Sequence, residues 1–250
     1  MDSGFYVAYA GFAARMQALD VVAGNLANAS TAGFKAQTPF YRALAAAQGG
    51  ELVSLNPLNQ ALNQFGILGG SRADLRAGSF DPTGNSTDLA IEGSAFFSVQ
   101  TPAGVRYTRN GNFRLDATRR LVTQDGSQVL AEQGKKLVPI VLPPGAVAVS
   151  PDGTLSVDGT LVAKLHLVQF APGTQPIPEG SSNYAVPAGS EQPAPGSNVR
   201  QGMLETSNIN PVEGTVGLIV LQRQSDLLAR ALSTLNTDFN RPATQDVPRV

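Results

Sequence analysis

Residues 2–34, DSGFYVAYAGFAARMQALDVVAGNLANASTAGF, carry the pattern that decides the fold. Large or apolar side chains recur along this stretch at alternating steps of four and three: Phe5, Tyr9, Phe12, Met16, Leu19, Ala23 and Leu26. Such spacing places them on one face of a helix, as in the seam of a coiled coil. We therefore predict a helix over residues 3–27.

A second apolar seam lies near the other end of the chain. Its members repeat at three and four, and only the serine among them is polar: Leu218, Leu221, Ser225, Leu228, Leu232, Leu235 and Phe239. Asn210 can cap this helix, Pro211 suits its first position, and Glu213 can complete a capping box. We predict that the two terminal helices pair through their seams and that the middle of the chain is carried outside them.

Between the two seams the sequence changes to a period of two, from Ser79 to about Phe170. Short alternating runs are separated by turn dipeptides such as Asp125-Gly126 and Asp158-Gly159, which is typical of antiparallel β structure. The predicted fold class is therefore α+β, with N- and C-terminal helices forming a coiled-coil-like pair and a central, mostly antiparallel all-β domain.

The same patterns predict a division of the chain. The predicted segments are an N-terminal helical assembly segment at 1–47, a linker or extended arm at 48–78, the central β domain at 79–171, a Gly/Pro-rich return linker at 172–198 that can include a strand, a C-terminal helical assembly segment at 199–240 and a tail at 241–250.

Composition excludes several classes of protein. Eighteen basic and 19 acidic residues leave a net charge of −1, which argues against a nucleic-acid binder, because that function needs a basic face. The absence of cysteine excludes disulfides and zinc–thiolate sites. The N-terminus lacks the pattern of a cleaved signal peptide, so we expect any export to use a route that does not read one.

No constellation in the sequence indicates catalysis. The only histidine, His166, lies in an alternating run and is interpreted as structural. The glycine-rich residues 66–72 lack the Gly-Lys-[Ser/Thr] ending of a phosphate loop. Residues 152–158 lack the density of oxygen ligands found in an EF-hand loop. We therefore expect no enzymatic activity, no cofactor, no metal site and no small-molecule substrate.

Several motifs resemble those of the flagellar basal-body rod protein family, over nearly the whole chain. In family order they are LDVVAGNLAN (19–28), TAGFK (31–35), DLAIEGSAFF (88–97), YTRNGNF (107–113), LVTQDG (121–126) and QGMLETSNINPVE (201–213). Two positions, Ala95 and Arg119, depart from the family pattern, which usually has glycine there. The modest length favours a rod subunit over the hook protein, and the compact middle and the Asp2 start favour the proximal-rod type over the distal-rod type.

The resemblance implies a mechanical function. Proteins of this family pass through the flagellar type III export apparatus and polymerise into the hollow rod that crosses the periplasm and transmits torque from motor to hook. The implied partners are other copies, neighbouring rod proteins and the export apparatus. The seam residues would make the contacts between subunits, and a signature loop containing Asn25, Asn28, Gly33 and Phe34 would bridge neighbours.

Other interpretations stay open at this stage. Another axial flagellar component, of distal-rod or hook-like type, would share these motifs. A secreted adhesin or carbohydrate-binding module would explain the β region and leave both seams without a function. A β-rich hydrolase would need an acid/base pair, and the sequence offers only carboxylates at turns.

Overall fold

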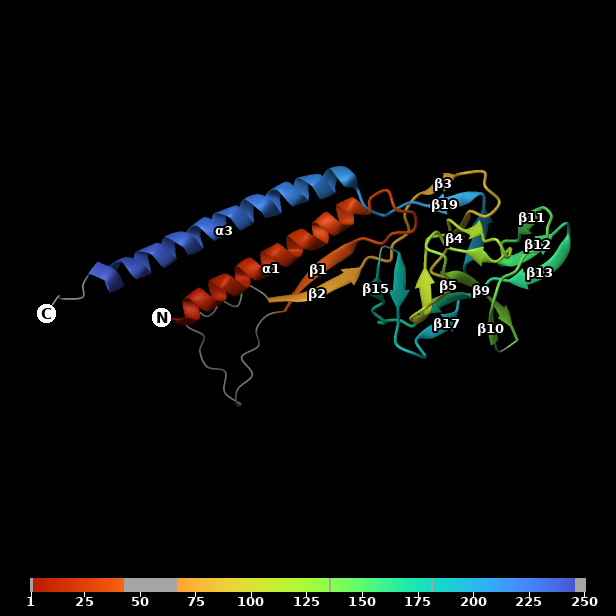
Figure 1. Ribbon diagram of the computed structural model, residues 1–250, viewed down its shortest axis with the longest axis horizontal. Coiled ribbons are helices and arrows are strands. Elements are labelled where there is room, and N and C mark those ends of the chain that lie inside the picture. The colour runs from red at the N-terminus through yellow and green to blue at the C-terminus, as the bar shows by residue number, and fades with distance from the viewer. Residues whose placement is uncertain (1, 43–66, 135, 181, 246–250) are drawn as a thin grey trace. The chain divides into compact units, whose positions relative to one another are not determined.

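The computed structural model describes residues 2–42, 67–134, 136–180 and 182–245, with side chains placed except within 2–8, at 10, and within 40–42, 67–69 and 235–245. The chain divides into two compact units (Figure 1). The helical unit comprises 1–26, 37–71 and 211–250, and the β unit comprises 27–36 and 72–210. The chain therefore passes from one unit to the other at 26/27, 36/37, 71/72 and 210/211.

Both predicted terminal helices are present in the helical unit. They are α1 (Asp2–Ala27) and α3 (Pro211–Gln245). As predicted, α3 begins at Pro211, where the missing N–H costs nothing because the first turn has no intrahelical acceptor for it. The Leu26 side chain lies near the start of α3, since a Cβ added at Gly214 would lie 3.7 Å from Leu26 Cδ1.

A two-stranded sheet also belongs largely to the helical unit. Its strands are β1 (Gln37–Arg42) and β2 (Ile67–Ala73). The predicted N-terminal helical segment, 1–47, thus contains a strand as well as a helix. Most of the predicted arm at 48–78, namely residues 48–66, lies outside the described residues.

The β unit is built around one large antiparallel sheet, as predicted. Its central path runs β15-β16-β6-β5-β9-β8-β7, while β10 pairs with β9, and β14 pairs with β5 and β17. The strands are β5 (Phe96–Thr101), β6 (Gly104–Thr108), β7 (Arg114–Leu115), β8 (Leu121–Val122), β9 (Gln128–Gln133), β10 (Lys136–Pro139), β14 (Leu167–Phe170), β15 (Ile177–Glu179), β16 (Asn183–Ala185) and β17 (Glu191–Pro193).

Three smaller sheets complete the unit. They are β11 (Val147–Val149) with β12 (Thr154–Val157) and β13 (Thr160–Lys164), β18 (Asn198–Gln201) with β4 (Leu89–Glu92), and β19 (Met203–Glu205) with β3 (Phe80–Pro82). The last two pairings join residues near 200 to residues near 80–90. The return of the chain is therefore integrated into the β unit before α3 begins.

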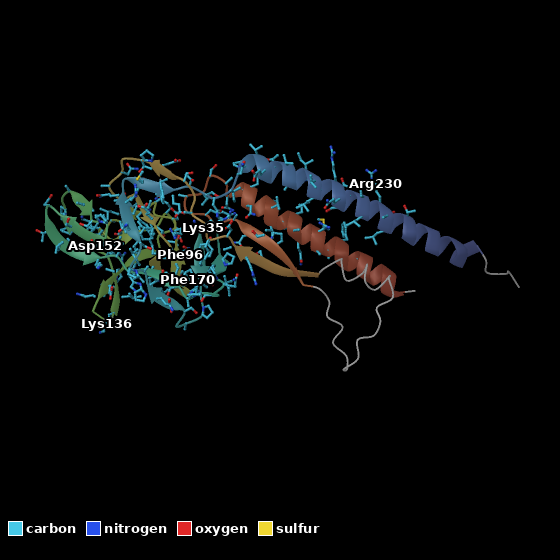
Figure 2. The ribbon with its side chains drawn as sticks, turned by 180° about the vertical axis from the view of Figure 1, so that it is seen from behind. Lys35, Phe96, Lys136, Asp152, Phe170 and Arg230 are labelled. Atoms are coloured by element: carbon cyan, nitrogen blue, oxygen red, sulfur yellow. The ribbon has the colours of Figure 1, made fainter. Side chains whose placement is uncertain are left out.

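The core of the β unit lies where these sheets face one another. Its largest cluster combines Phe97, Phe113, Leu121, Leu142 and Leu155, each at most 2% exposed. A second cluster contains Phe96, Tyr107, Val168 and Tyr184. Figure 2 shows side chains packed throughout this region. Because large side chains contribute about 1.5–3 kcal/mol each on burial, these clusters account for the compactness of the unit.

Two turns show how the local sequence determines backbone conformation. Asp158 and Gly159 both have positive φ, 48° and 78°, between β12 and β13. This is the requirement of a tight hairpin turn, which the Asp-Gly dipeptide predicts. Arg119 also has positive φ, 61°, and its guanidinium donates to the carbonyl oxygens of Leu142 and Pro143 at 2.8 and 2.7 Å. These bonds offset the strain that a glycine would avoid at this position.

Candidate functional site

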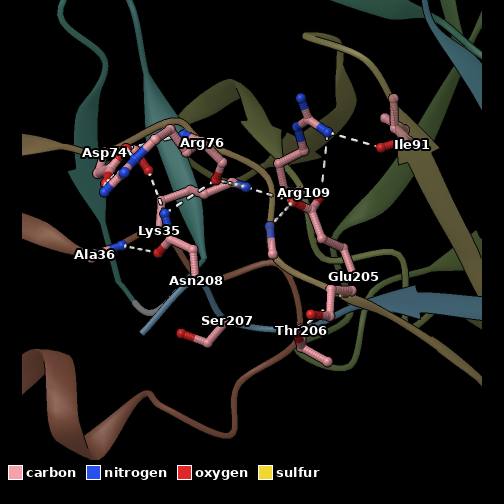
Figure 3. A network of polar contacts seen from close by, with 12 residues as sticks. Lys35, Ala36, Asp74, Arg76, Ile91, Arg109, Glu205, Thr206, Ser207 and Asn208 are labelled. Carbon is pink, nitrogen blue, oxygen red and sulfur yellow. Dashed lines mark hydrogen bonds and ion pairs between the residues drawn. The ribbon is translucent and has the colours of Figure 1, made fainter. Parts of the chain in front are cut away.

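The sequence motifs TAGFK, YTRNGNF and LETSN converge on a buried polar cluster in the β unit (Figure 3). We call its members, Lys35, Arg109, Glu205 and Asn208, the polar node. Lys35 has no exposed surface, and its ammonium donates to Glu205 Oε1 at 2.5 Å and to the Arg76 carbonyl at 2.8 Å. The first and last thirds of the chain are thus joined by an ion pair between residues 170 positions apart.

Arg109 reaches the same carboxylate from the end of β6. Its Nη1 donates to Glu205 Oε2 at 3.2 Å and to the Ile91 carbonyl at 3.0 Å, and its Nη2 donates to the Gly93 carbonyl at 2.5 Å. The guanidinium also lies over the Phe96 ring, 4.9 Å from its centroid, which is a cation–π arrangement. Arg109 therefore joins strands β4 and β5 to strand β19.

Charge in the polar node is unbalanced. Lys35, Arg109 and Glu205 are at most 2% exposed, so two buried cations share one carboxylate. Burial lowers the pKa of Lys35 and of Arg109, and Glu205 opposes the shift in both. Removing charges from water costs several kcal/mol per ion, so the node is held by its geometry and by the carbonyls that solvate it.

Gly33 explains why the TAGFK motif has glycine at its centre. Its φ is +66°, its N–H donates to the Glu205 carbonyl at 2.7 Å, and a Cβ at this position would lie 2.3 Å from the Arg109 carbonyl carbon. No side chain fits at that distance. Two backbones therefore meet here, and glycine alone permits the approach.

Asn208 connects three segments of the β unit. Its Oδ1 accepts from the Ala36 N–H at 2.8 Å, and its Nδ2 donates to the carbonyls of Asp74 and Arg76 at 2.8 and 3.1 Å. The Asp74 N–H donates in turn to the Ala36 carbonyl at 2.8 Å. Each of these three segments lies within a few residues of a point where the chain leaves the β unit, at 36, 72 and 210.

The predicted signature loop is divided between the two units. In the helical unit, Asn25 pairs with the Gln37 backbone in both directions, each bond 2.7 Å long. In the β unit, Asn28 accepts from the Thr31 hydroxyl at 3.2 Å, and Phe34 is 6% exposed. These contacts give Asn25, Asn28, Gly33 and Phe34 a structural role within the subunit, and bridging of neighbours stays a prediction.

The predicted seam of α1 is largely accessible where it is described. Tyr9 is 62% and Met16 40% exposed, while Phe12, Leu19 and Leu26 are half-buried. The most buried face of α1 instead carries small residues, Gly11, Ala14 and Ala18. The side chain of Phe5 lies outside the described residues.

The predicted seam of α3 is its least exposed face. Ser225 is buried, and Leu218, Leu221, Leu228 and Leu232 are half-buried. The side chains of Leu235 and Phe239 lie outside the described residues. At 100° per residue, a second set of apolar side chains lies roughly opposite this seam, and these are exposed: Val212, Val216, Ile219, Val220 and Leu227.

The polar node was not predicted as a site. Its residues stand inside the quoted motifs, yet nothing local shows that Lys35, Arg109 and Glu205 share one buried cluster. The available signal was the charge itself, because charged residues make up only 15% of the chain and seldom stand within buried motifs unless paired.

The remaining chemistry is sparse. Among the described residues, no three His, Asp or Glu side chains are grouped as a metal site would require. His166 lies between β13 and β14, with its Nδ1 2.8 Å from the Ser98 hydroxyl, and burial lowers its pKa. Within the part of the chain that the structure describes, no helix has the length and apolar character needed to cross a membrane.

Three family models match separate parts of the chain. Residues 5–35 match "Flagella basal body rod protein", residues 90–157 match "Flagellar hook protein FlgE/F/G D1 domain", and residues 200–245 match "Flagellar basal body rod FlgEFG protein C-terminal". The matched ranges contain Lys35, Arg109 and Glu205 respectively. The ion pairs of the polar node therefore join all three matched regions.

Full-length relatives agree with these matches. The flagellar basal-body rod protein FlgF of Caulobacter vibrioides is 32% identical over 258 residues, covering 100% of both chains. The chain belongs to the flagellar basal-body rod protein family. FlgF of Mesorhizobium japonicum is 34% identical with 89% of each chain covered, and FlgG of Buchnera aphidicola (from Acyrthosiphon pisum) is 30% identical with 94% of this chain and 96% of the relative covered.

The matches confirm the predicted family and the preference for the proximal-rod type, FlgF. The rod protein is a structural subunit of the flagellar basal body, where it assembles with other rod proteins. Its fold is α+β, with a helix near each end and a mostly antiparallel β unit between them.

Proposed function

We propose that this rod subunit polymerises through the apolar faces of α1 and α3, with the predicted seams closing on one another in a coiled-coil-like pair. The observation that carries the proposal is the pattern of exposure on α3. Half-buried leucines occupy one face, and exposed Val216, Val220 and Leu227 occupy the other. A helix that is apolar on two opposite faces has neighbours on both in its functional state.

Exposed apolar residues concentrate on the two helices. Of the 12 large hydrophobic side chains that are exposed among the described residues, seven belong to α1 or α3. In an isolated subunit this area faces water, and its burial between subunits would supply the driving force for polymerisation. The β unit, whose apolar side chains are mostly in its own core, would then lie on the outside of the rod.

The polar node would give the β unit the stiffness that a torque-bearing element needs. Load between the two units passes through covalent chain connections at four places in the sequence. Asn208 ties three of these segments together by hydrogen bonds, and Lys35 and Glu205 add an ion pair between two of them. These hydrogen bonds and the ion pair, close to the points where the chain leaves the β unit, would resist separation of the segments when force is applied along any one of them.

The subunit must also reach the growing rod. We expect export through the flagellar type III apparatus, followed by assembly into the hollow rod that spans the periplasm and transmits torque from motor to hook. The family assignment supports this route, and turnover of a substrate has no part in it.

A matched pair of substitutions tests the assembly surface. Leu227 on α3 is 66% exposed and Leu161 on β13 is 73% exposed. Leu227→Asp should leave the isolated protein folded and abolish motility and rod assembly, whereas Leu161→Asp should leave both intact. Circular dichroism of the purified variants checks folding. Motile cells carrying Leu227→Asp at normal expression would refute the assignment of α3 to the assembly surface.

Cysteine cross-linking tests the assembly surface independently of motility. The chain has no cysteine, so an introduced cysteine is its single reactive thiol. A single Leu227→Cys variant, labelled with a short reagent that has a thiol-reactive arm and a photoactivatable arm, should form cross-linked species in isolated basal bodies, and Leu161→Cys should not. The reverse pattern would place the β unit, rather than α3, between neighbouring subunits.

A further inference from the structure

One face of α1 is exposed along the part of the helix whose side chains are described. At about 100° per residue, its members lie within about 40° of Asp20 around the helix axis. They are the exposed residues Tyr9, Ala13, Met16, Asp20 and Gly24, which we call the outer face of α1. The buried residues Gly11, Ala14 and Ala18 lie on the opposite side. The outer face of α1 therefore remains accessible in the isolated subunit.

α3 has an outer face of the same kind. Its members are exposed and lie within about 40° of Arg223 around the helix axis. They are Val212, Val216, Ile219, Arg223, Leu227, Arg230 and Thr234, which we call the outer face of α3. The half-buried leucines of the predicted seam lie on the opposite side of the helix. Two arginines thus stand one heptad apart in a mostly apolar exposed stripe, and Arg230 is labelled in Figure 2.

The charged side chains of the two outer faces are opposite in sign. Among the described residues, the Asp20 carboxylate and the guanidinium groups of Arg223 and Arg230 take part in no ion pair or hydrogen bond. The nearest acid on α3, Asp226, lies about 60° around the helix from Arg223. A charge that is removed from water without a partner costs several kcal/mol. Contact between two α3 outer faces would bring arginines together, whereas contact between α1 and α3 pairs an acid with a base.

A polymer also needs two different surfaces that fit each other, because a surface that pairs with its own copy closes a dimer. The outer faces of α1 and α3 are two such surfaces. The end of α1 is close to the start of α3, since Leu26 lies beside Gly214, and the two helices run in opposite directions (Figure 1). In copies that point the same way along a polymer, the α1 of one copy is therefore antiparallel to the α3 of the next.

Side-chain size favours one alignment of the two outer faces. With Asp20 opposite Arg223, the smallest member of the α1 face, Gly24, lies opposite the β-branched Ile219. A large side chain then enters the gap left by a small one, as knobs enter holes in a coiled coil. With Asp20 opposite Arg230 instead, Ile219 would extend past the end of α1 and face no helix. The first alignment therefore buries more of the apolar surface of α3.

We propose that the outer face of α1 in one subunit packs, antiparallel, against the outer face of α3 in a second copy of this chain, with Asp20 paired to Arg223. The inference rests on the proposed assembly through the two helices, and it names which helix of the neighbour covers α3. Phe12, Leu19 and Leu26 are half-buried on a neighbouring side of α1, so they stay available for the predicted seam.

A pair of cysteines tests the contact. In this alignment Met16 lies opposite Leu227, and both side chains are uncharged and exposed, at 40% and 66%. Met16→Cys combined with Leu227→Cys should give cross-linked dimers and longer species when isolated basal bodies are treated with a short bismaleimide. Met16→Cys combined with Val220→Cys should give a lower yield, because Val220 lies about 10 Å away from Leu227 along α3.

The single-cysteine variants are the controls. Leu227→Cys alone carries one thiol per subunit, so the bismaleimide joins two copies only where α3 meets α3. Dimers from Leu227→Cys alone would overturn the proposal. An absence of dimers from the combined variant would overturn it as well, and this result includes the case in which a different rod protein covers α3.

An exchange of charges tests the ion pair. Asp20→Arg should lower motility, because it brings two unpaired cations together, and Arg223→Asp in the same chain should restore it. Asp20→Arg with Arg114→Asp is the control, since Arg114 is an exposed residue of β7 and the net charge is the same. Full motility of Asp20→Arg, no restoration by Arg223→Asp, or equal restoration by Arg114→Asp would each overturn the pairing.

These outcomes are distinct from a failure of the proposed function. Motile cells that carry Leu227→Asp would refute assembly through α3 itself. Loss of assembly in Leu227→Asp, together with no dimers from the paired cysteines, would leave assembly through α3 standing and exclude α1 of a second copy as its partner.

Discussion

Glu205→Gln is the substitution that the polar node makes most costly. The side chain is 1% exposed and accepts from Lys35 at 2.5 Å, Arg109 at 3.2 Å and the Gly78 N–H at 3.0 Å. Glutamine has the same shape, but it removes the only negative charge and turns one acceptor into a donor. Two buried cations would then face each other without compensation.

The magnitude follows from the cost of breaking a buried ion pair, about 3–5 kcal/mol. For a unit of this size, each kcal/mol corresponds to about 2–4 °C in melting temperature, so the expected loss is roughly 6–20 °C. Lys35→Met should cost less, about 1–3 kcal/mol, because it leaves a neutral Arg109–Glu205 pair. Both acceptors of the lost ammonium keep another donor, since Asn208 still donates to the Arg76 carbonyl and the Gly78 N–H to Glu205 Oε1. The order of the two effects, rather than either value, tests the charge argument.

Thermal and urea denaturation followed by near-ultraviolet circular dichroism measure these losses, since Tyr107 and Tyr184 are buried in the β unit. Glu92→Gln is the matched control. Glu92 pairs with Arg200 at 2.7 Å, but both side chains are about half exposed, and a surface pair contributes at most about 1 kcal/mol. The reasoning is refuted if Glu205→Gln costs no more than Glu92→Gln, or less than Lys35→Met.

Three further outcomes are expected from local features. Gly33→Ala should destabilise the β unit by more than about 3 kcal/mol, because left-handed strain of about 1–2 kcal/mol adds to a clash with the Arg109 backbone. Gly84→Ala is the control, since Gly84 has a similar φ and open space around it, and it should cost only the strain. Equal losses of stability in urea titrations of the two variants would contradict this. The pKa of His166, the single histidine, should lie below 6.5 in an NMR titration, because its burial outweighs the two nearby glutamates. The unfolded state then binds its proton at higher pH than the folded state, so stability should fall as pH drops through 6.5, and a pKa at or above that value would refute the account. Ser225→Ala removes a buried hydroxyl that has no hydrogen-bond partner among the described residues, which should stabilise the protein by about 1 kcal/mol. The thermal midpoint of the helix signal in circular dichroism should therefore rise. A lower midpoint would show that Ser225 Oγ has a partner in solution.

The number of strands in residues 172–198 does not follow from the local sequence, for a specific physical reason. Proline and glycine signal turns and so predict a return linker that can include a strand, and the structure has three strands there, β15, β16 and β17. Pro178 lies in β15, at the edge of the large sheet, and Pro193 ends β17. Proline is tolerated at such positions because its missing N–H faces away from the ladder. Whether a strand lies at an edge depends on the strand order of the whole sheet, so it cannot be inferred from the residues of that strand alone.

Features with a local cause could be predicted from the sequence alone. The spacing of apolar residues predicted α1 and α3, the Asp-Gly pair at 158–159 predicted a tight hairpin turn, and Pro211 predicted the start of the last helix. The order of the motifs predicted the family. In each case, hydrogen bonding and steric preference act between residues a few positions apart, so a pattern in the sequence reflects them directly.

Which charged side chains meet depends on how the whole chain packs. Lys35, Arg109 and Glu205 are separated by 74 and 96 positions, and three strand pairings plus the backbone contact at Gly33 bring them together. The cost of a buried charge depends on the dielectric and the partners around it, and these exist only after the sheets have packed. The ion cluster and its unbalanced charge are therefore properties of the folded chain.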